Sequence, residues 1–105
     1  MVDENTFDND GFLIDIYSWS EILAKQMAEK EFSIELTDLH MQIIQFVRDF
    51  YFKWEAVPMM KTIITNFKLG NGQIDEMFKR GRSSSRGIIC KLGGLPKMLC
   101  IASGC

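Results

Sequence analysis

The sequence is poor in the residues that most often carry chemistry. It contains one histidine, two prolines and three cysteines, and no apolar run reaches the 18 or more residues of a membrane span. A lone histidine without a Cys-x-x-Cys pair argues against a zinc site, so we expect neither a metal nor a cofactor. The N-terminus carries Asp3, Glu4 and Asp8 where a signal peptide would carry basic residues. We therefore expect a cytoplasmic protein without contact to a membrane.

What is present is typical of one folded domain. Hydrophobic residues make up 47% of the chain and charged residues 25%, which is the balance of globular and not of disordered proteins. A chain of 105 residues is long enough for a single core without staples. We predict one domain over residues 1–105. Cys90, Cys100 and Cys105 all fall near the C-terminus, and an odd number so placed cannot form a closed disulfide framework.

The charges are divided unevenly between the two halves of the chain. Residues 1–55 hold twelve acidic and four basic side chains, whereas residues 56–105 hold eight basic and two acidic ones. No acidic residue follows Glu76. The cysteines therefore lie in a basic segment, where neighbouring cations favour the thiolate form.

Apolar residues three or four positions apart predict about five helices. A capping box at residues 18–21 predicts a helix over about residues 19–30. Thr37 fits the N-cap of the longest helix, which we expect to reach about Trp54. Start or stop signals for three shorter helices lie at Pro58, Gly70–Gly72 and Gly93–Gly94. Side chains expected in the core include Trp19, Ile22, Ile43, Val47, Trp54, Met59, Met60 and Met77.

Two polar positions of the long helix invite a catalytic interpretation. We expect His40 to pack or cap the helix, and Arg48 with Asp49 to form an ion pair or a partner contact. At the N-terminus, the turn residues Asn9, Asp10 and Gly11 predict a small β-hairpin. The predicted fold class is mainly α (α+β): a small helical bundle with an N-terminal β-hairpin and a flexible C-terminal arm over residues 94–105.

Several sequence blocks occur in the order of the signature blocks of a known protein family. The blocks are Asp8-Asn9-Asp10-Gly11-Phe12-Leu13 with Trp19, Leu36-Thr37-Asp38-Leu39-His40, Phe46-Val47-Arg48-Asp49-Phe50-Tyr51, Pro58, and Cys90-Lys91-Leu92-Gly93-Gly94-Leu95-Pro96-Lys97. Over nearly its whole length the chain resembles the DsrC/TusE family, also called the gamma subunit of dissimilatory sulfite reductase. The C-terminal block is the most specific part of this resemblance.

The resemblance implies a sulfur-relay protein that carries sulfur on a cysteine of a mobile arm. Family members present this sulfur to a sirohaem sulfite reductase or to a sulfur relay that ends in tRNA thiolation. Cys100 would receive and deliver sulfur, and Cys90 matches the second cysteine that joins it by a disulfide or a sulfur bridge. Such a protein is a co-substrate or a sulfurtransferase component and not a stand-alone enzyme, and any sirohaem would belong to the partner. Supports for the anion and for docking would be Lys97, Lys91, Arg86 and Arg82.

The arm departs from the family pattern, and this leaves alternatives for each thiol. Ile101 holds the slot of the family's near-terminal cysteine, and Cys100 stands one residue earlier. Cys105 ends a short extension and could take over the role of Cys100. On the residues alone, Cys90 could equally be a small buried hydrophobe beside residues 88–89, and Cys100 an inert thiol in a packed tail.

Two other functions remain open for this sequence. The first is a regulatory nucleic-acid-binding relative, because six positive charges without an acid lie between Lys79 and Lys97. No recognition helix rich in Arg, Asn or Gln accompanies them, so we expect this block to dock on a partner protein and not on nucleic acid. The second is a structural subunit of a sulfite reductase complex. We expect the chain to be monomeric when it is not bound to its partner.

Overall fold

The computed structural model describes Leu13, residues 15–81 and residues 84–95. Their helices are η1 (Ile16–Ser18), α1 (Glu21–Met27), the π-helical η2 (Ala28–Phe32), α2 (Asp38–Trp54), α3 (Met60–Phe67), α4 (Gln73–Phe78) and α5 (Ser85–Leu92). The predicted helical class and the number of about five helices are confirmed. The predicted N-terminal hairpin falls on residues that, apart from Leu13, lie outside the described part of the chain.

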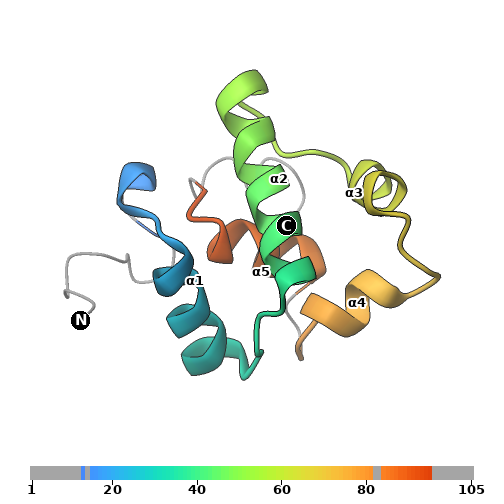
Figure 1. The fold of residues 1–105 in the computed structure, drawn as a ribbon, viewed down its shortest axis with the longest axis horizontal. Coiled ribbons are helices and arrows are strands. Elements are labelled where there is room, and N and C mark those ends of the chain that lie inside the picture. The colour runs from blue at the N-terminus through green and yellow to red at the C-terminus, as the bar shows by residue number, and fades with distance from the viewer. Residues whose placement is uncertain (1–12, 14, 82–83, 96–105) are drawn as a thin grey trace.

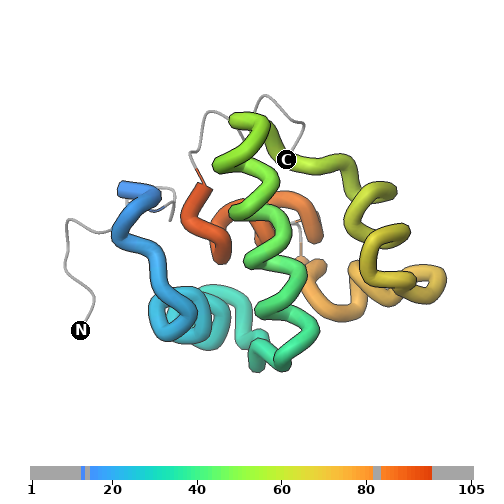
Figure 2. The backbone as a smooth tube through the Cα atoms, turned by 45° about the horizontal axis from the view of Figure 1, so that its top comes forward, coloured from blue at the N-terminus to red at the C-terminus, as the bar shows by residue number. Residues whose placement is uncertain are grey.

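The bundle is organised around α2 and α5. In Figure 1 the long helix α2 runs through the middle of the molecule, with α1 on one side and α3 and α4 on the other. Helix α5 lies against α1, α2 and α4. Turned by 45°, the tube in Figure 2 shows the end of α5 between η1 and the C-terminal half of α2. Three segments far apart in the sequence therefore meet at one end of the bundle.

Helix α2 follows the prediction closely. Thr37 caps it: the Thr37 hydroxyl accepts a hydrogen bond from the backbone amide of His40. The helix ends where Glu55 adopts a left-handed backbone conformation, with φ of +52°. Its buried face carries Ile43, Ile44 and Val47, and this face packs against the buried side chains of α5 in the core.

Helix α1 begins later than the capping pattern predicts. The residue that caps it is Ser20, whose hydroxyl accepts a hydrogen bond from the Leu23 amide at 3.1 Å. Ser18 instead donates to the carboxylate of Asp15. The prediction of Trp19 as a helical residue was therefore wrong, because its extended backbone leaves the indole outside the helix and directed at α5. Ile22, expected in the core, is 69% exposed.

The middle helices are shorter than expected but lie where the pattern placed them. Helix α3 begins two residues after Pro58 and ends before the glycine signal, because Lys68 already adopts a left-handed conformation with φ of +53°. Met60 and Met77 are half-buried against the core as expected. Met59 is 64% exposed, since it forms the extended N-cap of α3 and not part of its apolar stripe. Trp54 is likewise exposed, at the last turn of α2.

Candidate functional site

Three of the predicted site residues lie on α5 within the described part of the chain: Cys90, Lys91 and Arg86. Cys90 has no exposed surface and belongs to the hydrophobic core, together with Ile88 and Ile89 of the same helix. Its environment matches that of a small buried hydrophobe, so reagents reach the thiol only after the surrounding structure opens. The predicted residues Cys100, Cys105, Lys97 and Arg82 lie outside the described residues.

The two described cations of the predicted site contact the body of the protein. The Arg86 guanidinium donates to the Val57 carbonyl oxygen at 3.4 Å. The Lys91 ammonium lies 6.0 Å from the centre of the Phe32 ring. Both side chains are half-buried. These contacts tie α5 to the loop before α3 and to η2.

Helix α5 ends in a tight hydrogen-bonded turn. The Leu95 amide donates to the Cys90 carbonyl and the Gly94 amide to the Lys91 carbonyl, each at 3.1 Å. This pair of bonds is the Schellman arrangement, in which the residue after the C-cap adopts a left-handed conformation. Gly94 has the required φ of +67°, and Leu95 is fully buried. The predicted end of the last helix at Gly93–Gly94 is confirmed, and both glycines are buried.

Close packing makes glycine necessary at position 94. A Cβ atom there would lie 2.8 Å from Cδ2 of Leu13 and 3.0 Å from Cδ1 of Trp19. Both contacts are shorter than ordinary van der Waals separations, so any side chain would force these neighbours apart. The turn after α5 is therefore fixed from the N-terminal side by Leu13 and Trp19.

Two side chains from other elements bind the carbonyl groups at the end of α5. Trp19 donates its indole N–H to the Leu92 carbonyl at 2.7 Å. Arg48 donates from Nη1 to the Gly93 carbonyl at 2.6 Å and from Nη2 to the Ile16 carbonyl at 3.3 Å. The last carbonyls of a helix have no partner within it, and here the body supplies one for Leu92 and one for Gly93. We call Trp19 and Arg48 the α5 clamp.

Arg48 is an unusually placed cation. Only 6% of its surface is exposed, and its guanidinium carbon lies 4.3 Å from the Trp19 ring centre and 5.2 Å from that of Phe52. Burial lowers the pKa of Arg48, which the charge of Asp49 opposes, but an arginine stays protonated in proteins. Nε has no hydrogen-bond partner among the described residues. The expected ion pair or partner contact did not include this role, in which the side chain turns inward and binds two backbone carbonyls.

An exposed aromatic pair lies directly beside the α5 clamp. The rings of Tyr17 and Phe52 are 5.9 Å apart, and Tyr17 is 81% and Phe52 47% exposed. The Phe52 ring centre lies 5.2 Å from the guanidinium carbon of Arg48. The aromatic pair therefore joins the buried cation of the α5 clamp to the protein surface.

The opposite end of α2 holds the second buried polar side chain, His40. Its Nε2 lies 3.0 Å from the Met77 carbonyl oxygen, which can only accept, so Nε2 carries the proton. Nδ1 then accepts from the Thr37 amide at 3.1 Å, which completes a capping box. Burial lowers the pKa of His40; the bond to Met77 opposes this and the charge of Arg80 adds to it. The expected capping role is confirmed.

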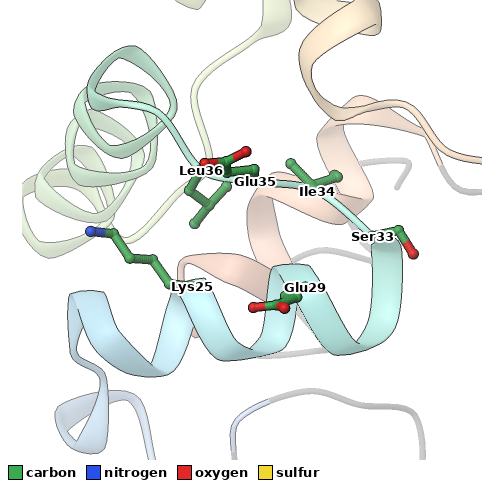
Figure 3. Close-up of a pocket in the computed structure, with 6 residues that line it drawn as sticks. All are labelled: Lys25, Glu29, Ser33, Ile34, Glu35 and Leu36. Atoms are coloured by element: carbon green, nitrogen blue, oxygen red, sulfur yellow. The ribbon is translucent and has the colours of Figure 1, made fainter.

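A groove of about 580 Å³ lies between α1–η2 and the segment that leads into α2. Figure 3 shows its lining side chains: Lys25, Glu29, Ser33, Ile34, Glu35 and Leu36. Among the described residues of the predicted site, namely Cys90, Lys91 and Arg86, none lines this groove. In the part of the chain that the structure describes, His, Cys, Asp and Glu do not gather in groups of three or more that could hold a metal ion. Nor does any described helix combine the length and hydropathy needed to cross a membrane.

The chain is similar to characterised proteins over most of its length. The profile of a family described as "DsrC like protein" matches residues 2–101. The sulfurtransferase TusE homolog of Haemophilus influenzae is 36% identical over 97 residues, which cover 86% of this chain and 85% of that protein. The gamma subunit of the dissimilatory-type sulfite reductase of Nitratidesulfovibrio vulgaris is 30% identical over 90 residues, or 86% and 83% of the two chains. The crystal structure of the oxidized gamma subunit (DsrC) from Archaeoglobus fulgidus superimposes with a TM-score of 0.71 at 29% identity, covering 87% of this chain and 86% of that one.

Proposed function

This chain belongs to the DsrC-like protein family, and from that premise we propose that it is a sulfur-relay protein that carries sulfur on a cysteine of its C-terminal arm. The observation that carries the proposal is the anchored end of α5. Leu95 is fully buried and hydrogen-bonded, and the thiols of Cys100 and Cys105 follow shortly after it in the sequence. A rigid body thus presents a short thiol-bearing segment from a fixed point.

The proposed reaction is the transfer of one sulfur atom between thiols. The arm thiolate attacks the outer sulfur of a donor persulfide, the S–S bond of the donor breaks, and the donor leaves as a thiolate. The arm cysteine then carries the sulfur as its own persulfide. Delivery to an acceptor thiolate is the same step in reverse, so the relay needs no external oxidant or reductant.

The anchored end limits where a partner can bind. An extended chain spans at most about 3.3–3.6 Å per residue, so the Cα atom of Cys100 stays within about 18 Å of that of Leu95, and the Cα atom of Cys105 within about 36 Å. We therefore propose that the partner, a sulfurtransferase or a dissimilatory-type sulfite reductase, binds at the end of the bundle where α5 stops. Lys97 and Lys91 favour the thiolate and an acidic partner surface.

Cys90 is proposed as the resolving thiol. Its thiolate would attack the inner sulfur of the Cys100 persulfide and release hydrosulfide, which leaves a disulfide between the two residues and balances without an oxidant. The structure buries Cys90 completely, so this step requires an opening of the end of α5.

Mass spectrometry of the native protein after incubation with inorganic polysulfide tests the carrier role. We expect a gain of about 32 Da, one sulfur atom, on the tail peptide. Cys100→Ser and Cys105→Ser identify which thiol holds it, and Cys90→Ser serves as the control that keeps the sulfur. If no tail cysteine gains sulfur, the proposal fails, and a structural role in a reductase complex would then account for the family membership.

A further inference from the structure

We propose that Trp19 and Arg48 are positioning residues of the sulfur relay: the α5 clamp keeps Cys90 covered, and release of the clamp is the step that makes Cys90 reactive. The inference rests on the proposed function for its use in a reaction, but the opening itself is a property of this fold. It assigns a task to two side chains outside the cysteine-bearing arm.

Cys90 belongs to the last turn of α5. Its carbonyl accepts from the Leu95 amide, and the two carbonyls that follow Lys91 are those held by Trp19 and Arg48. Unwinding of this turn is the smallest rearrangement that uncovers the thiol, because the preceding turns carry the buried side chains of Ser85 and Ile88. Local opening of this kind starts at helix ends.

Each bond of the clamp must break when the last turn of α5 unwinds. The Trp19 indole loses its acceptor and the buried Nη1 of Arg48 loses the Gly93 carbonyl. Both donors reach α5 from elements that stay in place, namely the segment before α1 and the C-terminal half of α2. The strength of these two bonds therefore sets how often Cys90 becomes accessible.

The shape of the guanidinium is essential to the clamp. The Arg48 guanidinium lies over the Trp19 ring and over the Phe52 ring and uses two different nitrogens to reach α5 and η1. A lysine ammonium is a point charge without a planar face, and it cannot stack on the rings and bridge both carbonyls. Arg48→Lys thus removes the Arg48 part of the clamp while it preserves charge and much of the volume.

The test is the rate at which a thiol reagent labels Cys90 in the folded protein. In a Cys100→Ser/Cys105→Ser background Cys90 is the only cysteine, so labelling by N-ethylmaleimide is read directly from the mass. We expect slow labelling in this background and labelling about tenfold faster with Arg48→Lys or with Trp19→Phe. Trp19→Phe keeps an aromatic ring but removes the indole donor. It therefore tests the role of the clamp even if Arg48→Lys does not fold.

A matched control separates opening of the clamp from global unfolding. His40→Gln alters the other buried polar side chain of α2, which faces α4 and not the end of α5. We expect it to lower overall stability with little effect on Cys90. Labelling through the clamp should also depend weakly on urea below the unfolding transition, since little surface is exposed.

Labelling of either clamp variant at the rate of the His40→Gln control, or with the steep urea dependence of global unfolding, overturns the inference. The assay uses no sulfur donor, so it is independent of the polysulfide experiment. Sulfur gained on the arm together with unchanged labelling would reject the clamp and retain the relay.

Discussion

The two ends of helix α2 each bury one polar side chain, and they solve the problem differently. At the N-terminal end, His40 is neutral and both of its ring nitrogens have partners, one in the cap and one on α4. Toward the C-terminal end, Arg48 is a cation with an Nε that lacks a partner among the described residues. At His40 every ring nitrogen is hydrogen-bonded. Arg48 instead binds the end of another helix, α5, through hydrogen bonds that break when that end unwinds.

The largest expected effect comes from removing the donors of Arg48. Arg48→Met keeps an unbranched side chain of similar length but leaves the Gly93 and Ile16 carbonyls without their donor. Each buried acceptor without a partner costs about 1–3 kcal/mol, so we expect a loss of about 3 kcal/mol in the free energy of unfolding. Urea denaturation followed by circular dichroism measures it. A loss below about 1 kcal/mol would show that water replaces the clamp at no cost.

The second effect compares two glycines with similar backbones, Gly94 after α5 and Gly72 before α4. Gly94 and Gly72 have φ of +67° and +76°, but a Cβ would meet Leu13 and Trp19 only at Gly94, and nothing within 4 Å at Gly72. We expect Gly72→Ala to cost about 1 kcal/mol from backbone strain alone. Gly94→Ala should cost about 2 kcal/mol or more, because crowding adds to the strain. Equal losses by thermal denaturation would mean that the turn after α5 yields easily.

The third effect is a dependence on pH that only the His40 end should show. Burial lowers the pKa of His40 in the folded protein below its ordinary value of 6.5. The stabilisation is therefore complete above pH 6.5 and is lost as the pH falls through the lower folded value, by at most about 1.4 kcal/mol per pH unit. Urea unfolding between pH 7 and pH 5 measures the slope. His40→Gln should flatten it, whereas Arg48→Met should leave it in place.

The smallest effect is at the cap of α2. Thr37→Ala removes the hydroxyl that accepts from the His40 amide and contacts its ring, which we expect to cost about 1 kcal/mol. Thr37→Ser retains the hydroxyl and is the control. Because the α5 clamp lies at the far end of the helix, Cys90 labelling should not change with Thr37→Ala. A change would mean that the two ends of α2 are coupled.

Local signals predicted the parts of the fold that depend on neighbouring residues. The Thr37 cap, the reach of α2 to Trp54, and the stop at Gly93–Gly94 follow from capping chemistry and apolar periodicity within a few residues. The start of α1 was misjudged because Ser18 and Ser20 both precede an acceptable helix. The bond of Ser18 to Asp15 and the tertiary bond of the Trp19 indole to Leu92 both favour the later start.

The α5 clamp was missed because it joins residues distant in the sequence. Trp19 and Leu92 are 73 positions apart and Arg48 and Gly93 are 45 positions apart, and no local pattern encodes such pairs. One signal was available: Arg48 follows Ile44 by four positions and Val47 by one, which places it on the buried stripe of α2. A cation at such a position must find acceptors inside the protein, and this could have directed attention to a helix end.

The position of Arg48 also alters the electric field at the point where the chain leaves α5. The aligned peptide dipoles of a helix gather roughly half an elementary negative charge at its C-terminus, and this charge would oppose a thiolate brought nearby. In this protein a full positive charge lies against the Gly93 carbonyl and more than offsets it. An anionic sulfur returning to the end of α5 would therefore meet attraction where a bare helix terminus would repel it.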